Sequence, residues 1–70
     1  MSMQPDEIFQ LIIKADERLK YATDERGAAR REQAKALLEQ ALAAAQEIGD
    51  AALAEQAQRR LSDVEALEEG

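Results

Sequence analysis

Adjacent carboxylates are the groups of this chain that could most readily do chemistry, because paired acids can bind a metal ion or act as acid and base. They occur as Asp16 with Glu17, Asp24 with Glu25, and Glu68 with Glu69. On a helix, neighbouring side chains point about 100° apart, so the two members of a pair do not converge on one ion. The chain has no His, so the Glu-x-x-His pieces of a di-iron bundle are absent. We therefore expect solvated charges and no metal site.

Nucleophilic chemistry is equally poorly supported, because the chain has neither Cys nor His to supply a thiolate or a neutral-pH base. Its hydroxyl groups are those of Ser2, Tyr21, Thr23 and Ser62. We interpret Ser62 as a small residue that lets helices approach closely. The three glycines stand far apart and form no phosphate-binding loop. The sequence predicts no catalytic residues, no cofactor and no small-molecule substrate, and hence a protein that is not an enzyme.

The charge of the chain argues against nucleic acids and anionic membranes as partners. The net charge is −6, and the basic pairs Arg30-Arg31 and Arg59-Arg60 each stand among acidic residues. Binding to phosphates requires clustered Lys and Arg. No stretch approaches the ~18 apolar residues of a membrane span, and residues 1–4 lack the features of a signal peptide. We therefore expect a cytoplasmic protein.

These residues must be positioned by helices, because apolar residues recur every three to four positions and nothing alternates with the period of a strand. Three helices are predicted, over about 5–22, 29–48 and 51–68 of a single domain. Pro5 suits the first helical position, and Gly27 is the expected turn residue, although a helix continuing through it would cost only about 1 kcal/mol. Gly49 is predicted to end the second helix in a left-handed conformation, and Asp50 to cap the third.

Each predicted helix has one apolar face on a wheel of about 100° per residue. The predicted buried faces consist of Ile8, Leu11, Ile12, Ala15, Leu19 and Ala22; of Ala34, Leu37, Leu38, Ala41, Leu42, Ala45 and Ile48; and of Leu53, Ala54, Ala57, Leu61, Val64 and Leu67. Ala36, Ala43 and Ala44 fall outside the second face. Glu55 with Arg59 and Arg59 with Asp63 have the spacing of ion pairs on a helix surface.

The second half of the chain resembles tetratricopeptide repeats of the longer, roughly forty-residue kind. The matching residues are Ala34, Leu38, Ala41, Leu42, Ala45, Gly49 and Asp50, followed by Leu61, the small Ser62 and Gly70. The likeness covers about residues 33–70, and the whole chain corresponds to about one and a half repeats. It departs at Gln58 and Glu65, where the family usually has large apolar residues. The chain has no Asn, so the family's peptide-carboxylate clamp is not implied.

A weaker resemblance is to the microtubule-interacting-and-transport domain, an acidic three-helix bundle that binds amphipathic helices. Both resemblances imply closely packed antiparallel helices and a role in binding other proteins. We therefore predict an all-α fold, a three-helix antiparallel array with tetratricopeptide-like packing.

Phe9 and Ile13 lie beside the apolar face of the first helix, and two interpretations are open. Either that helix is central and both residues belong to the core, or they face a partner, since an exposed apolar strip on so small a protein marks an interface. We favour the interface. Arg60 falls inside the apolar face of the third helix, where it either extends to water or pairs with a carboxylate at a subunit or partner interface.

The predicted function is a non-enzymatic protein–protein interaction module with Phe9, Ile13 and Arg60 at its binding surface. Its partner would be another protein or a second copy of the chain, most simply as a dimer. The alternative is a purely structural homo-oligomeric bundle without a separate partner. Association is favoured because a chain of 70 residues has little core relative to its surface.

Overall fold

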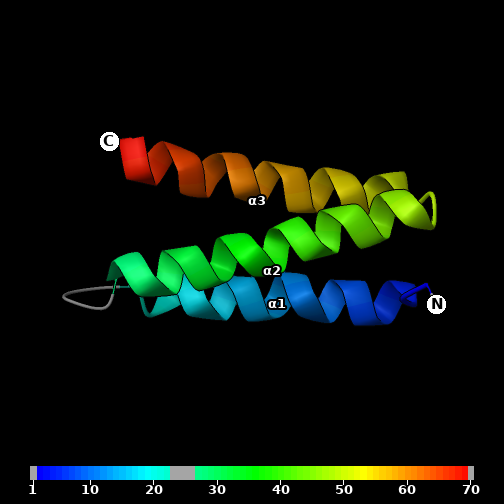
Figure 1. Ribbon diagram of the computed structural model, residues 1–70, viewed down its shortest axis with the longest axis horizontal. Helices are drawn as coiled ribbons and strands as arrows, with labels where there is room; N and C mark the ends of the chain where they lie inside the picture. Colours follow the sequence, from blue (N-terminus) through cyan, green and yellow to red (C-terminus); the bar gives the residue numbers. More distant parts are fainter. Residues whose placement is uncertain (1, 23–26, 70) are drawn as a thin grey trace.

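The computed structural model of the chain describes residues 2–22 and 27–69 and contains three antiparallel α-helices: α1 (Pro5–Lys20), α2 (Gly27–Glu47) and α3 (Ala51–Glu69) (Figure 1). The predicted all-α, three-helix antiparallel fold is therefore confirmed. The carboxylates Asp24 and Glu25, with Thr23, Arg26 and Gly70, lie outside the described residues, as does the side chain of Glu69.

The start of α1 follows from its first residues. Pro5 occupies the first turn, where its missing N–H leaves no hydrogen bond unmade. The backbone N–H of Gln4 donates to the carboxylate of Glu7 at 2.9 Å, and Asp6 adds a second negative charge at this end of the helix dipole. The helix ends at Lys20, before the predicted boundary at Ala22, and α2 begins at Gly27 itself. Gly27 is thus a helical residue, and the chain does not continue as one helix through it.

The corner between α2 and α3 has the predicted chemistry. Gly49 adopts a left-handed backbone conformation with φ of 72°. Its N–H donates to the carbonyl of Gln46, and the N–H of Asp50 donates to that of Ala45, which is the Schellman pattern of a helix end. The carboxylate of Asp50 then accepts from the N–H of Leu53 at 3.0 Å and caps α3. This compact corner brings α3 back along α2.

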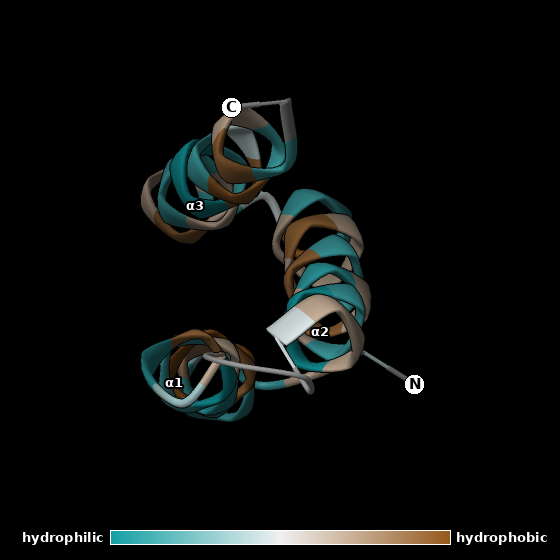
Figure 2. Cartoon of the chain, turned by 90° about the vertical axis from the view of Figure 1, so that its left-hand side faces the viewer, coloured by the Kyte–Doolittle hydropathy of each residue, from teal (hydrophilic) through white to brown (hydrophobic). Residues whose placement is uncertain are grey.

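The core lies along α2, which is the central helix. Viewed along the helices, α1 and α3 both lie on the same side of α2 (Figure 2), and each packs along it while they contact each other very little. Within residues 2–22 and 27–69, twelve hydrophobic residues are buried: Ile8, Ile12, Ala15, Ala34, Leu38, Ala41, Ala44, Ala45, Leu53, Ala57, Leu61 and Val64. Most of the α2 members are alanines, which allow both outer helices to approach closely.

Among the described residues, Ala44 and Leu67 depart from the predicted faces, and Ser62 departs from its predicted role. Ala44 is buried and belongs to the core cluster, so the buried arc of α2 is wider than the predicted face. Leu67 is 67% exposed, and Ser62 is exposed and so does not mediate a helix contact. Asp16 of α1 is opposite Arg60 of α3, so the last residue of α1, Lys20, is at about the level of Val64. Leu67 lies past that level, where α1 no longer runs beside α3.

Candidate functional site

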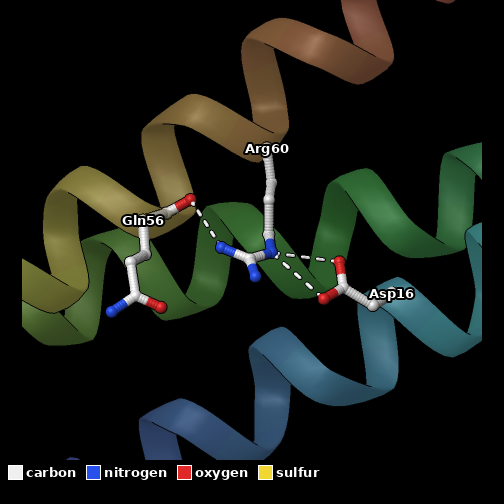
Figure 3. A network of polar contacts seen from close by, with 3 residues as sticks. All are labelled: Asp16, Gln56 and Arg60. Carbon is white, nitrogen blue, oxygen red and sulfur yellow. Dashed lines mark hydrogen bonds and ion pairs between the residues drawn. The ribbon is translucent and has the colours of Figure 1, made fainter.

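Arg60 forms an ion pair with Asp16 across the gap between α3 and α1. Its Nε lies 3.0 Å and 3.1 Å from the two carboxylate oxygens, and its Nη1 donates to the carbonyl of Gln56 at 3.4 Å (Figure 3). The side chains of Arg60 and Asp16 are 32% and 47% exposed, so the pair is at the surface. The guanidinium on the apolar flank of α3 is therefore paired within the chain, and its predicted role at a partner interface stays a prediction.

The same ion pair shows the register of the two outer helices, which run parallel to each other. Phe9 lies seven residues before Asp16, and Leu53 lies seven residues before Arg60. Seven residues make almost two full turns, so each pair occupies one flank of its helix, about 10 Å apart along the axis. Phe9 and Leu53 therefore stand at the same level on the side where α1 and α3 face each other. We call this side of the molecule the open face.

Phe9 is a large apolar side chain in the first half of α1 that the fold leaves exposed. It is 43% exposed, whereas Ile8 and Ile12 on the same helix are completely buried. Ile13, one turn further along, is partly buried. The interpretation that places Phe9 in the core is therefore wrong. The helix α1 packs on α2 through Ile8, Ile12 and Ala15, and Phe9 lies on a neighbouring side of the helix that is exposed. That Phe9 and Ile13 bind a partner stays a prediction.

The described carboxylates act as isolated charges and ion-pair partners. Among residues 2–22 and 27–69, no group of three or more acidic residues could hold a metal ion. Asp16 binds Arg60, and Glu68 accepts from Nζ of Lys35 at 3.3 Å, joining α3 to α2. The hydrogen bond and the charge of Glu68 raise the pKa of Lys35 above its ordinary value of 10.5. Glu55 pairs with Arg59 at 2.9 Å as predicted, whereas the predicted pair of Arg59 with Asp63 is not among the ion pairs of the described residues.

A groove lined by three basic residues and one acidic residue was not anticipated from the sequence. It has a volume of about 510 Å³ and lies between the end of α1 and the start of α2; its lining residues are Lys14, Glu17, Arg18, Tyr21, Arg30 and Leu37. The signal was the spacing of Lys14 and Arg18 at positions i and i+4 of α1, with Tyr21 directly after the end of the helix. Glu17 within the lining partly offsets the three cations, so the groove is a mixed-charge surface.

The fold and these surfaces define a small three-helix all-α domain. Comparison with protein-family models, with curated protein sequences and with solved structures gave no match for the chain. In the described part of the chain, no helix combines the length and apolar character needed to cross a membrane.

Proposed function

We propose that this chain is a non-enzymatic protein–protein interaction module that binds through the open face and the adjoining flank of α1. The observation that carries the proposal is the exposure of Phe9, which is 43% although it lies between the completely buried Ile8 and Ile12 in the sequence. Exposed large apolar side chains grouped on a small domain are typical of binding surfaces, and aromatic residues are enriched in them. Ile13 extends the apolar area by one turn.

The proposed architecture is tetratricopeptide-like, with α1 and α2 as one helical hairpin and α3 as the first helix of the next. Support comes from the small buried residues Ala34, Ala41 and Ala45 of α2 and from the compact corner at Gly49 and Asp50. In such an array the first helices of successive hairpins run parallel on one side of the helix between them, and α1 and α3 both lie on the same side of α2 (Figure 2), although they contact each other very little. The surface between them is then the natural place for a bound polypeptide.

The experiment compares two double variants with matched charge changes. Phe9→Asp with Ile13→Lys alters the proposed surface, and Ala43→Asp with Ala36→Lys alters two exposed positions of α2. The first variant should lose binding to a partner identified by cross-linking and confirmed with both purified proteins, or should change the mass seen in sedimentation equilibrium. The second should behave as the parent chain does. Unchanged binding and unchanged mass in the first variant would overturn the proposal.

The second candidate is a purely structural homo-oligomer. The limited contact between α1 and α3 favours it, because the sides of these two helices that face each other could be covered by a further copy of the chain. It predicts a melting temperature that rises with protein concentration and no separate partner.

A further inference from the structure

Four residues of α1 form a narrow strip on the flank that α2 leaves uncovered. They are Asp6, Phe9, Ile13 and Lys20, which we call the α1 strip. At about 100° per residue, all four residues fall within an arc of about 60° around the helix axis. This arc lies more than 90° from the centre of the buried face of α1, which Ile8, Ile12 and Ala15 form. With Asp16 included, the spacings are three, four, three and four residues, which is the pattern of the contact seam in paired helices.

The charges of the α1 strip are opposite at its two ends. Asp6 and Lys20 are each seven residues from Ile13, so the acid and the base lie about 10 Å from it in opposite directions along the helix. Phe9 and Ile13 provide the apolar centre. Asp6 and Lys20 are exposed, and Nζ of Lys20 lies 5.8 Å from the ring centre of Tyr21. The carboxylate of Asp16, by contrast, already binds Arg60.

We infer that the partner of this surface is a second copy of the same chain, docked with its α1 antiparallel about a two-fold axis at Ile13. This inference rests on the proposed function and names its partner. An antiparallel arrangement brings Asp6 of one copy opposite Lys20 of the other, and the two-fold axis forms that pair twice. A parallel arrangement would instead bring Asp6 to Asp6 and Lys20 to Lys20, which like charges disfavour.

The same symmetry places the two Ile13 side chains together and brings both Phe9 side chains to the seam. An isologous interface requires a patch that is complementary to itself under a two-fold rotation. The α1 strip has this property in the opposite charges of Asp6 and Lys20 and in Ile13 at the axis, while Phe9 of each copy lies opposite the segment of the other copy that holds Asp16 and Glu17. Because one strip is a small contact, the dimer should be weak, with a dissociation constant of micromolar order or above.

The test is a charge swap read by sedimentation equilibrium of the full chain, from about 1 μM to about 1 mM. The parent chain should shift from the monomer mass of 7.7 kDa towards twice that value. Asp6→Lys alone and Lys20→Asp alone should each weaken the dimer about ten-fold, since each places two like-charged pairs at the seam. An equimolar mixture of the two variants should associate as the parent does, because opposite charges then face each other again at both ends of the seam. The chain that carries both changes should recover as well.

Matched controls carry the same charge changes away from the strip. Glu39→Lys on α2 and Lys14→Asp on the other flank of α1 should leave the dimer unchanged. Asp6→Lys also removes a favourable charge from the start of α1, so melting curves of each variant establish that the monomer is folded. Recovery in the mixture cannot come from a damaged helix, so this measurement separates interface from stability.

The inference fails if the single variants associate like their controls, or if the mixture does not recover. It also fails if the parent chain stays monomeric over the whole range. In that last case, a purified partner whose binding is lost with Phe9→Asp and Ile13→Lys would leave the proposed function standing, whereas a monomer without such a partner would remove both.

Discussion

The Nε atom of Arg60 lies 3.0 Å from Oδ1 and 3.1 Å from Oδ2 of Asp16, and this contact joins the two helices that otherwise touch least. The helices α1 and α3 are held in place mainly by their packing on α2, and the ion pair shows which residues of the two helices stand at the same level. On the open face the ion pair lies about two helical turns beyond the level of Phe9, so charged and apolar side chains follow each other along this side of α1.

A double-mutant cycle on Asp16→Asn and Arg60→Gln should yield a coupling free energy of about 0.2–1 kcal/mol, the range of exposed ion pairs. Both side chains are roughly one-third to one-half exposed, so the solvent screens their attraction. Chemical denaturation of the four proteins gives the value, and the coupling should fall as salt is added. A coupling of zero at low salt would show that the pair makes no contribution in solution.

The two isoleucines at positions 12 and 13 should respond differently to truncation. Ile12 is completely buried, so Ile12→Ala should lower the free energy of unfolding by about 2–5 kcal/mol. Ile13 is only partly buried, and Ile13→Ala should cost about 1 kcal/mol or less when the chain is a monomer. Urea denaturation at low protein concentration measures both. Equal losses would mean that both residues belong to the core.

Much of the fold follows from local patterns along the chain. Ile8, Ile12 and Ala15 recur at helical spacing and are all completely buried, and the same holds for Ala34, Leu38 and Ala41. Gly49 and Asp50 carry a signal of their own, because the left-handed conformation and the helix cap depend only on adjacent residues. The apolar face of each helix and the corner at Gly49 and Asp50 could be predicted, since each follows from residues close together in the sequence.

The open face could not be predicted in the same way. A helical wheel places Arg60 on a flank of its own helix, but its partner Asp16 is 44 residues away in the sequence. Which residue it meets depends on the register of α1 against α3. The exposure of Leu67 and the burial of Ala44 likewise depend on where a neighbouring helix ends or lies. These features depend on how the helices pack against one another, and the periodicity of residues within one helix gives no information on that packing.

Close packing around α2 should make its buried alanines intolerant of larger side chains. Ala41 is completely buried, so Ala41→Leu should cost about 1–3 kcal/mol through displaced neighbours. Ala43→Leu, at an exposed position on the same helix, is the matched control and should change stability by less than about 0.5 kcal/mol. Thermal and chemical denaturation measure both variants. If Ala41→Leu did not change the stability, the core around Ala41 would have room for a larger side chain, and the close packing of the outer helices on α2 would be contradicted.

Gly49 should be needed for its backbone conformation and not for lack of space. A Cβ at this position would meet no atom within 4 Å, but the φ of 72° is strained for L-residues. Gly49→Ala should therefore cost about 1–2 kcal/mol, and Gly49→Asn less, because Asn tolerates the left-handed region. A synthetic chain with D-alanine at position 49 should instead be at least as stable as the parent. Destabilisation by D-alanine would contradict the conformational explanation.

The pair of Lys35 with Glu68 should give the chain a contribution to stability that disappears only at alkaline pH. The pKa of Lys35 is raised above 10.5, chiefly by its hydrogen bond to Glu68 and by the charge of that carboxylate. A raised pKa means that the folded state holds this proton more tightly than the unfolded chain does. The contribution is therefore fully present below pH 10.5 and is lost as the pH rises through the pKa of the folded state.

Glu68→Gln should lower the pKa of Lys35 towards 10.5, as measured by NMR titration of the side-chain methylene next to Nζ. Its effect on the free energy of unfolding should be constant near neutral pH and should shrink above pH 10.5, where the parent chain loses the same interaction. Glu17→Gln on α1 removes an equal charge elsewhere and should leave the titration of Lys35 unchanged. A pKa of Lys35 that does not fall in Glu68→Gln would mean that the 3.3 Å contact between α2 and α3 is not maintained in solution.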